Sequence, residues 1–195
     1  IVEHARRLAE RIGALRQAGK IPLFIGGDCS LLVAAGLALR RAGRYGLAHL
    51  DGHTDFRHPG NSAACASLAG EDLAAAVGRH WPAVADIDGL GPYFQPRDAV
   101  HAGCRDQDQH LIEVSGLLAM VVPASVIVGG SASAVAEGLS ATLNQFGVGG
   151  YWLHLDVDIL DPGVMPAVDS PDSGGLGPDQ LTELLAVLAP GAVGA

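Results

Sequence analysis

The stretch Gly46-Leu47-Ala48-His49-Leu50-Asp51-Gly52-His53-Thr54-Asp55 joins a short, mostly apolar run to a cluster of charged residues. Its first five residues have the length and character of a strand that is buried on both faces of a parallel sheet. The side chains of Asp51, His53 and Asp55 alternate along the chain, so an extended backbone points all three to one side. The stretch therefore predicts a buried strand with three metal ligands at its carboxyl end. The alternative is an ordinary Asx turn before a helix.

Two further segments have the same form. The apolar run 151–155 is followed by Asp156-Val157-Asp158, whose two carboxylates share one side. The run 21–25 is followed by Gly26-Gly27-Asp28-Cys29-Ser30, in which the glycines permit a tight turn. A lone thiol such as Cys29 is usually a core residue, but its place at a strand end also suits a ligand. Ligands gathered from several strand ends suit a pair of divalent ions and hydrolytic chemistry.

Apolar runs alternate with segments of helical spacing along the whole chain. We expect strands at 21–25, 46–50, 98–102, 118–122 and 151–155, and helices at 2–18, 30–41, 68–77, 107–117, 131–146 and 178–189. This alternation predicts one three-layer α/β/α domain over residues 1–195, with a mostly parallel sheet and a site at the carboxyl ends of its strands. The chain begins inside a helix and stops at 191–195, where another strand begins, so we expect it to be incomplete at both ends.

The composition excludes several classes of partner. The chain has 12 basic and 21 acidic residues and a net charge of −9, which argues against nucleic acid and favours a small cationic substrate. No apolar run reaches the roughly 18 residues of a membrane span. Three scattered cysteines make no disulfide framework, so we expect a cytoplasmic protein.

Three segments resemble, in order, the signature motifs of the ureohydrolase family, which includes arginase, agmatinase and formimidoylglutamase. Residues 26–30 resemble the family's Gly-Gly-Asp-His-Ser, residues 51–55 its Asp-Ala-His-x-Asp, and residues 156–162 its Asp-Val-Asp-x-Leu-Asp-Pro. The resemblance implies an arginase-like fold. It also implies a hydrolase that cleaves a linear amidine or guanidino compound with two divalent ions, manganese being the expected metal, and it allows a homo-oligomer.

The same resemblance implies a role for each matching position. It assigns two bridging carboxylates and two further ligands for each ion: Asp51 and Asp156 as bridges, His53 and Asp158 for one ion, Cys29 and Asp55 for the other. Asp55 is also the expected catalytic residue, which hydrogen-bonds the bridging hydroxide. Residues 103–108 resemble Gly-Leu-Arg-Asp-x-Asp, whose last aspartate meets the substrate's α-amine, so Asp108 is a predicted substrate ligand. Arg57, near the entrance, is a second one, for a substrate carboxylate.

Three departures from the family pattern leave the activity open. Cys29 stands where the family has histidine, and a thiolate shifts metal preference from manganese toward zinc, iron or cobalt. Residues 62–73 lack the proton-shuttling histidine of arginases, and Leu68 or Ala69 takes its place. The family's substrate-binding glutamate would lie beyond Ala195. An Nω-hydroxyguanidine or formimino substrate, a catalytically degenerate metal-binding protein, and zinc amide hydrolysis on the related deacetylase fold are the alternatives.

The remaining histidines and cysteines receive lesser roles. His49 and His154 precede Asp51 and Asp156 by two positions, so they share a side with these ligands and are predicted to support them. His58 is expected to be an exposed loop residue. We expect the others to be surface or core residues without a role: His4, His80, His101 and His110, with Cys65 and Cys104 as small buried hydrophobes.

Overall fold

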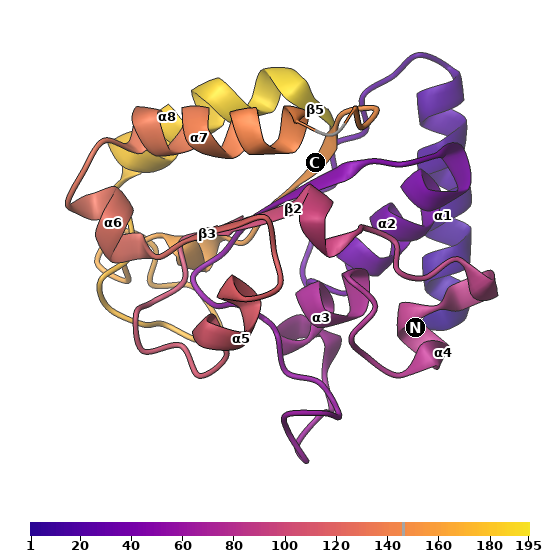
Figure 1. Cartoon of the computed structure of the whole chain (residues 1–195), viewed down its shortest axis with the longest axis horizontal. Coiled ribbons are helices and arrows are strands. Elements are labelled where there is room, and N and C mark those ends of the chain that lie inside the picture. The colour runs from indigo at the N-terminus through magenta and orange to yellow at the C-terminus, as the bar shows by residue number, and fades with distance from the viewer. Residues whose placement is uncertain (146) are drawn as a thin grey trace.

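A five-stranded parallel sheet forms the centre of the computed structural model, which describes residues 1–145 and 147–195 (Figure 1). The strands are β1 (Gly46–Leu50), β2 (Ala99–Ala102), β3 (Met120–Val122), β4 (Tyr151–Leu155) and β5 (Ala192–Gly194). They lie side by side in the order β3-β2-β1-β4-β5. Leu50 pairs with Leu155, and the amide of Asp156 donates to the carbonyl of Leu50 at 2.9 Å. The register of β1 and β4 therefore places the two acidic strand ends side by side.

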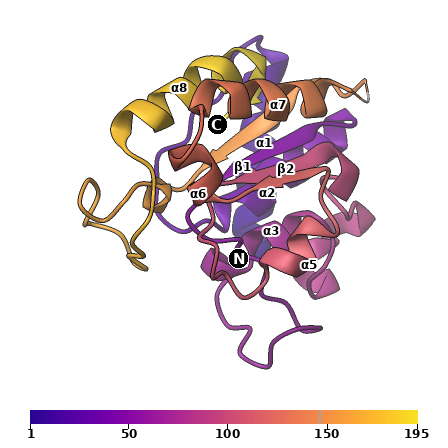
Figure 2. The same ribbon diagram turned by 60° about the vertical axis from the view of Figure 1, so that its left-hand side comes forward.

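Helices cover both faces of the sheet and complete three layers (Figure 2). One face carries α1 (Val2–Gln17), α2 (Leu31–Ala42) and α3 (Asp72–Ala76), and the other carries α7 (Ala132–Asn144) and α8 (Pro178–Leu188). The short helices α4 (Pro82–Ala85), α5 (Leu111–Ser115) and α6 (Ala124–Val128) lie in the connections. The predicted three-layer α/β/α fold is confirmed, and the five strands are parallel throughout.

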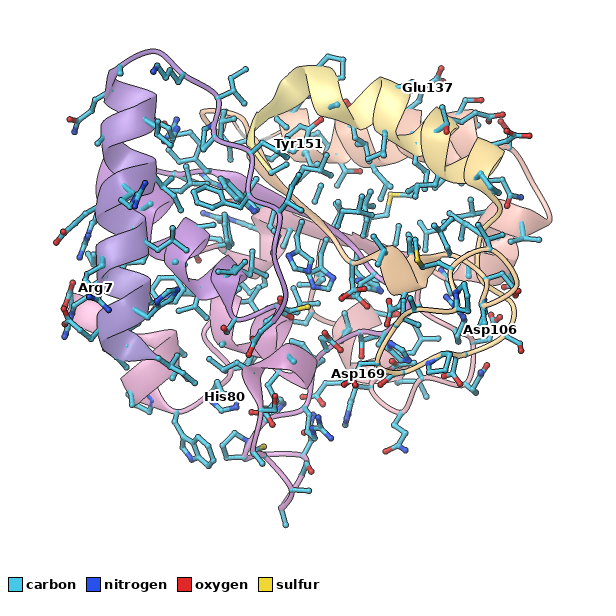
Figure 3. The ribbon with its side chains drawn as sticks, turned by 180° about the vertical axis from the view of Figure 1, so that it is seen from behind. Arg7, His80, Asp106, Glu137, Tyr151 and Asp169 are labelled. Carbon is cyan, nitrogen blue, oxygen red and sulfur yellow. The ribbon has the colours of Figure 1, made fainter. Side chains whose placement is uncertain are left out.

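The two layers of core explain why these residues fold in this way. Every residue of β1 is buried, as its apolar run predicts. In α2, the eight residues Leu32–Leu39 are buried consecutively, because the helix is wedged between α1 and the sheet. On the other face Tyr151 opens β4 and donates its hydroxyl to the carbonyl of Leu188, far from the loops of Asp106 and Asp169 (Figure 3).

Some predicted elements differ from the observed ones. Residues 21–25 form an extended segment rather than a strand, because their only ladder bonds join Pro22 and Phe24 to Ala195. The helix predicted at 68–77 divides into a 3₁₀ turn, Leu68–Gly70, and α3, because Glu71 leaves helical geometry and its carboxylate accepts from the amides at 66 and 67. In the helix predicted at 131–146, Phe146 lies outside the described residues.

The loop predicted at 80–97 and the helix predicted at 107–117 also differ in detail. The loop contains α4 and two 3₁₀ turns. The helix shortens to α5 because the carboxylate of Asp108 accepts from the amide of His110 and turns the chain before the helix begins. Within the described part of the chain, none of the helices has the length and hydropathy needed to cross a membrane.

Candidate metal centre

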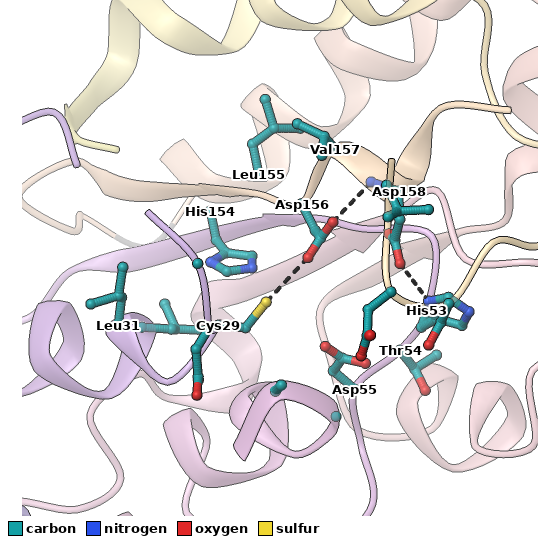
Figure 4. A pocket seen from close by; sticks show the side chains of 18 of the residues that line it. Cys29, Leu31, His53, Thr54, Asp55, His154, Leu155, Asp156, Val157 and Asp158 are labelled. Atoms are coloured by element: carbon teal, nitrogen blue, oxygen red, sulfur yellow. Dashed lines mark hydrogen bonds and ion pairs between the residues drawn. The ribbon is translucent and has the colours of Figure 1, made fainter. Parts of the chain in front are cut away.

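The carboxyl ends of β1 and β4 bring two of the predicted motifs into direct contact (Figure 4). The ring nitrogen Nδ1 of His53 lies 2.8 Å from Oδ2 of Asp158, and the amide of Gly52 donates to Oδ1 of Asp158 at 2.9 Å. The amide of His53 donates to Oδ1 of Asp51 at 2.7 Å. These bonds link the two strand ends, so Asp51, His53 and Asp158 form one compact set of potential ligands.

The third motif reaches the same place from the loop before α2. Asp28 adopts a left-handed conformation with φ of 72° and accepts from the amide of Ser30, which turns the chain so that Cys29 faces the strand ends. The sulfur of Cys29 lies 3.2 Å from Oδ2 of Asp156, whose Oδ1 accepts from the amide of Asp158 at 2.8 Å. The side chains of all six predicted metal ligands are therefore neighbours.

Five of the six predicted metal ligands, all except Asp156, form two groups that share one carboxylate. Ligand atoms of Asp51, His53 and Asp158 all lie within 4.8 Å of one another, and so do those of Cys29, Asp51 and Asp55. Asp51 belongs to both groups, as a carboxylate that bridges two ions must. Oxygen donors dominate, with one imidazole and one thiol, which is a donor set suited to divalent ions.

Burial and mutual repulsion disfavour the negative charges of this cluster. Burial and the neighbouring carboxylates raise the pKa of Asp51 and of Asp55 well above the ordinary value. Burial also raises the pKa of the Cys29 thiol. Burial opposes ionisation of Asp158 too, but the hydrogen bonds from His53 and Gly52 outweigh it and lower its pKa. Positive charge bound among these groups would stabilise their ionised forms.

The two predicted substrate ligands line the cleft above the strand ends. Asp108 accepts from the amide and hydroxyl of Thr54, at 2.9 and 2.7 Å, and from the amide of His110. Arg57 is 40 % exposed, and its Nε lies 3.6 Å from Oε1 of Glu71. Asp108 is thus held rigidly near Asp55, whereas Arg57 is tied to a buried glutamate and is less free than predicted.

Arg105 has a role that the sequence did not reveal. Its guanidinium is buried and donates to the backbone carbonyls of Gly103, Asp158, Leu160 and Asp172. These bonds hold the loop after β4 against the end of β2. The Gly-Cys-Arg-Asp segment was a visible signal, but only the folded chain shows that the arginine binds backbone oxygens.

A second polar cluster lies behind the strand-end carboxylates. It contains His49 and His154, predicted as supporting residues, together with His101 and Asp72, for which the sequence predicted no role. Nε2 of His49 and Nε2 of His154 each lie 3.9 Å from Oδ2 of Asp51. A signal for the cluster did exist in the sequence, because a histidine occupies the penultimate position of β1, β2 and β4.

The predictions for three other residues have different outcomes. His58 was expected to be exposed, and this is wrong: its ring is buried and pairs with Oε1 of Glu113 at 3.0 Å. Cys104 is buried as predicted. Cys65 is only half-buried, because its short loop leaves one side of the thiol open.

Asp72 provides a test of the electrostatics in the metal-free chain. Burial raises its pKa from 3.8 to about 7, so its carboxyl is protonated in the fold at pH values where it is ionised in the unfolded chain. The stability that it contributes is complete below about pH 4 and is lost as the pH rises to about 7. Three pKa units correspond to roughly 4 kcal/mol.

We therefore expect Asp72→Asn to stabilise the metal-free chain by an amount that grows from near zero at pH 4 to about 4 kcal/mol at pH 8. Urea unfolding of both proteins in the presence of a chelator measures the difference at each pH. A constant difference between pH 4 and pH 8 would show that Asp72 does not titrate in this range.

Comparison with known proteins gives a consistent picture. The model of the arginase family matches residues 2–195. The arginase of Brevibacillus brevis is 30% identical over 180 residues, which cover 90% of this chain and 59% of the relative. Human arginase-1 is 28% identical over 178 residues, which cover 88% and 55% respectively. The chain thus spans about three fifths of the length of these curated relatives.

Solved structures agree at the level of the fold. The arginase of Bacillus cereus has a TM-score of 0.88 and 26% identity, and the match covers 100% of this chain and 68% of that one. A hypothetical agmatinase from Burkholderia thailandensis has a TM-score of 0.75 and 24% identity, with coverage of 99% and 55%. The described sheet and its helical layers therefore correspond to about two thirds of the Bacillus enzyme.

Proposed function

This chain belongs to the arginase family, and we propose that it hydrolyses a carbon–nitrogen bond of a linear guanidino or amidine compound at a pair of divalent metal ions. The observation that carries the proposal is the carboxylate of Asp51, which is close both to His53 and Asp158 and to Cys29 and Asp55. Asp156 is the second bridge in this assignment, because its two oxygens face Cys29 on one side and the Asp158 turn on the other.

The residues present fit two such ions. His53 and Asp158 would hold one of them, and Cys29 and Asp55 would hold the other, with manganese as the family's usual metal. When bound, the two ions lower the pKa of a shared water toward neutrality. Asp55, in the left-handed conformation with φ of 45°, is the catalytic residue that orients the attacking water through its carboxylate. Asp55 is half-buried and lines the cleft, so its carboxylate is accessible from the substrate side.

Substrate recognition uses the acidic lining of the cleft. A carboxylate has about four lone-pair sites, and Asp108 uses three of them for Thr54 and His110. The remaining site is available to the ammonium group of an amino-acid substrate. Arg57 would meet a substrate carboxylate only after leaving Glu71, which makes it the weaker of the two substrate contacts.

The residue at the expected position of the proton shuttle determines which substrate is preferred. Ala69 lines the cleft and has no group that can donate a proton to a departing amine. A guanidine of low basicity, such as an Nω-hydroxyguanidine, depends least on such help. The missing proton donor, together with Cys29, favours the second candidate function, a metal-binding protein without turnover.

Turnover measurements separate the two candidates. The protein is loaded with Mn²⁺, Co²⁺ or Zn²⁺, and its metal content is determined alongside release of urea, ammonia or hydroxyurea from L-arginine, agmatine, Nω-hydroxy-L-arginine and a formimino compound. Release from any of these substrates supports the hydrolase. Two tightly bound ions without release from the whole panel would establish the metal-binding protein instead.

The metal preference has its own prediction. We expect Cys29→His to lower the dissociation constant for Mn²⁺ by about tenfold, equivalent to 1.4 kcal/mol, and to weaken the preference for Zn²⁺. The physical reason is that imidazole replaces a soft, charged thiolate that favours zinc. Equilibrium dialysis of each metal against both proteins measures the effect, and Cys104→Ser, at a buried thiol elsewhere, is the control. Unchanged affinities for both metals would show that Cys29 is not a ligand.

A further inference from the structure

Three histidines on neighbouring strands lie at the same position along the sheet, and their side chains meet. His49 pairs in register with His101 on β2 and with His154 on β4. The rings of His49 and His154 stack with centroids 4.6 Å apart, and Nδ1 of His49 lies 2.9 Å from Nδ1 of His101. His154 lies beside Cys29 and Asp156 (Figure 4). The Nε2 atoms of His49 and His154 consequently face the same small region.

Asp72 enters this region from α3. It is fully buried, and neither of its carboxylate oxygens has a hydrogen-bond partner among the described residues. Nε2 of His49, Nε2 of His154 and Oδ2 of Asp51 are likewise buried and without partners in the described part of the chain. Buried polar atoms in native proteins are nearly always satisfied, so five such atoms around one point indicate a missing ligand.

The spacing of these atoms distinguishes a shared ion from direct hydrogen bonds. Nε2 of His49 lies 3.5 Å from Oδ1 of Asp72, and Nε2 of His154 lies 3.7 Å from its Oδ2. Both distances exceed the 2.7–3.2 Å of an N–H···O bond. Ligands of a tetrahedral zinc ion lie about 3.3–3.4 Å apart, given bonds of about 2.0–2.1 Å. The separations of Asp72 from His49 and from His154 are therefore close to the spacing of two ligands on one ion.

The hydrogen bond between the rings fits the same interpretation. A histidine that binds a metal through one nitrogen normally donates a hydrogen bond from the other. When Nδ1 of His49 donates to Nδ1 of His101, Nε2 of His49 keeps a free lone pair directed at Asp72. His101 is thus the residue that sets the orientation and tautomer of His49.

The charge of the buried carboxyl group of Asp72 also supports a bound cation. The buried carboxyl of Asp72 has neither an ion pair with an arginine or lysine nor a hydrogen bond among the described residues. Ionising such a group in the interior is strongly unfavourable when nothing compensates the charge. A cation held by Asp72 would remove this penalty.

We propose that His49, His154 and Asp72 bind a third divalent transition-metal ion, with Oδ2 of Asp51 as the fourth ligand. Imidazole donors make this inner site more nitrogen-rich than the outer pair, so it favours zinc over manganese. Except for Asp51, its ligands belong to none of the three signature motifs, and the inference does not depend on the proposed function. The ion would bind Asp51 on the side away from the outer pair of ions and fix the orientation of its carboxylate.

Metal content tests the proposal directly. The Cys29→His chain, which lacks the thiolate that would compete for zinc, is stripped with a chelator, given one equivalent of Zn²⁺ and then excess Mn²⁺, separated from free ions by gel filtration and analysed by mass spectrometry of its metals. We expect one zinc and two manganese ions per chain. Asp72→Asn and His154→Gln should each lose the zinc, whereas Asp158→Asn should lose manganese and keep the zinc.

Control variants distinguish the specific loss of this metal site from a general loss of folded structure. Asp98→Asn removes another buried carboxylate, one that pairs with Arg44 at the opposite end of β2, and should retain all three ions. Circular dichroism shows whether each variant is folded, and the ligand-field absorption of Co²⁺, added in place of zinc, should persist in Asp158→Asn and vanish in Asp72→Asn.

Two results would overturn the proposal. In the first, Asp72→Asn and His154→Gln retain as much zinc as the parent, as expected if water alone fills the region. In the second, zinc is lost with Asp158→Asn instead. Failure of the proposed function appears differently: turnover and manganese binding are absent, while the zinc bound through Asp72 remains.

Discussion

Asp156→Asn is expected to reduce turnover by about 10³-fold or more, the scale on which electrostatic catalytic groups fail, and to release manganese. The asparagine oxygen can still accept from the amide of Asp158, so the turn after β4 is retained. What disappears is the negative charge beside Cys29. Steady-state kinetics with the best substrate of the panel, together with metal analysis, measures both effects.

The matched control for this variant is Asp106→Asn, which removes an exposed carboxylate that pairs with the hydroxyl of Ser125. We expect it to retain the activity and metal content of the parent, because a surface hydrogen bond contributes little to the site. If Asp156→Asn retained both manganese and turnover, the bridging role of Asp156 would be wrong.

The second large effect concerns substrate choice. We expect kcat/KM for Nω-hydroxy-L-arginine to exceed that for L-arginine by about 10²–10⁴-fold, the usual contribution of a general acid or base. Without a histidine near Ala69, the departing amine lacks a dedicated proton donor with either substrate, but the less basic hydroxyguanidine compensates because it offers a neutral electrophile near pH 7. Parallel kinetics under one metal condition measure the ratio.

The variant Ala69→His tests whether the missing histidine causes this substrate preference. Ala69 lines the cleft and is only half-buried, so a longer side chain has room to extend toward the substrate. The substitution should raise kcat/KM for L-arginine and so reduce the ratio of kcat/KM for Nω-hydroxy-L-arginine to that for L-arginine. A clear preference of the parent for L-arginine would refute the role given to the missing histidine, and no turnover of either substrate would favour the metal-binding protein.

Much of the fold could be predicted because its signals are local. β1 and β4 consist of short, mostly apolar runs that end in aspartate, and both were predicted at their observed bounds. Elements whose ends are set by bonds between a side chain and nearby backbone were predicted less well. Glu71 interrupts the helix predicted at 68–77, and Asp108 delays α5, because each carboxylate accepts from backbone amides that would otherwise extend regular structure.

For the candidate site, polar clusters after two apolar strands predicted that these side chains would gather at the strand ends. The structure brings them together because parallel strands deliver their carboxyl ends to one edge of the sheet, and their role as metal ligands stays a prediction. The order and register of β1, β2 and β4 place His49 between His101 and His154, and the packing of α3 against the same face of the sheet places Asp72 opposite His49 and His154. The acidic strand ends therefore follow from the chain's local pattern. The histidines near the ends of three strands were a local signal, but only the tertiary structure decides that their rings meet and that Asp72 faces them, since contacts between elements are not encoded by a local pattern.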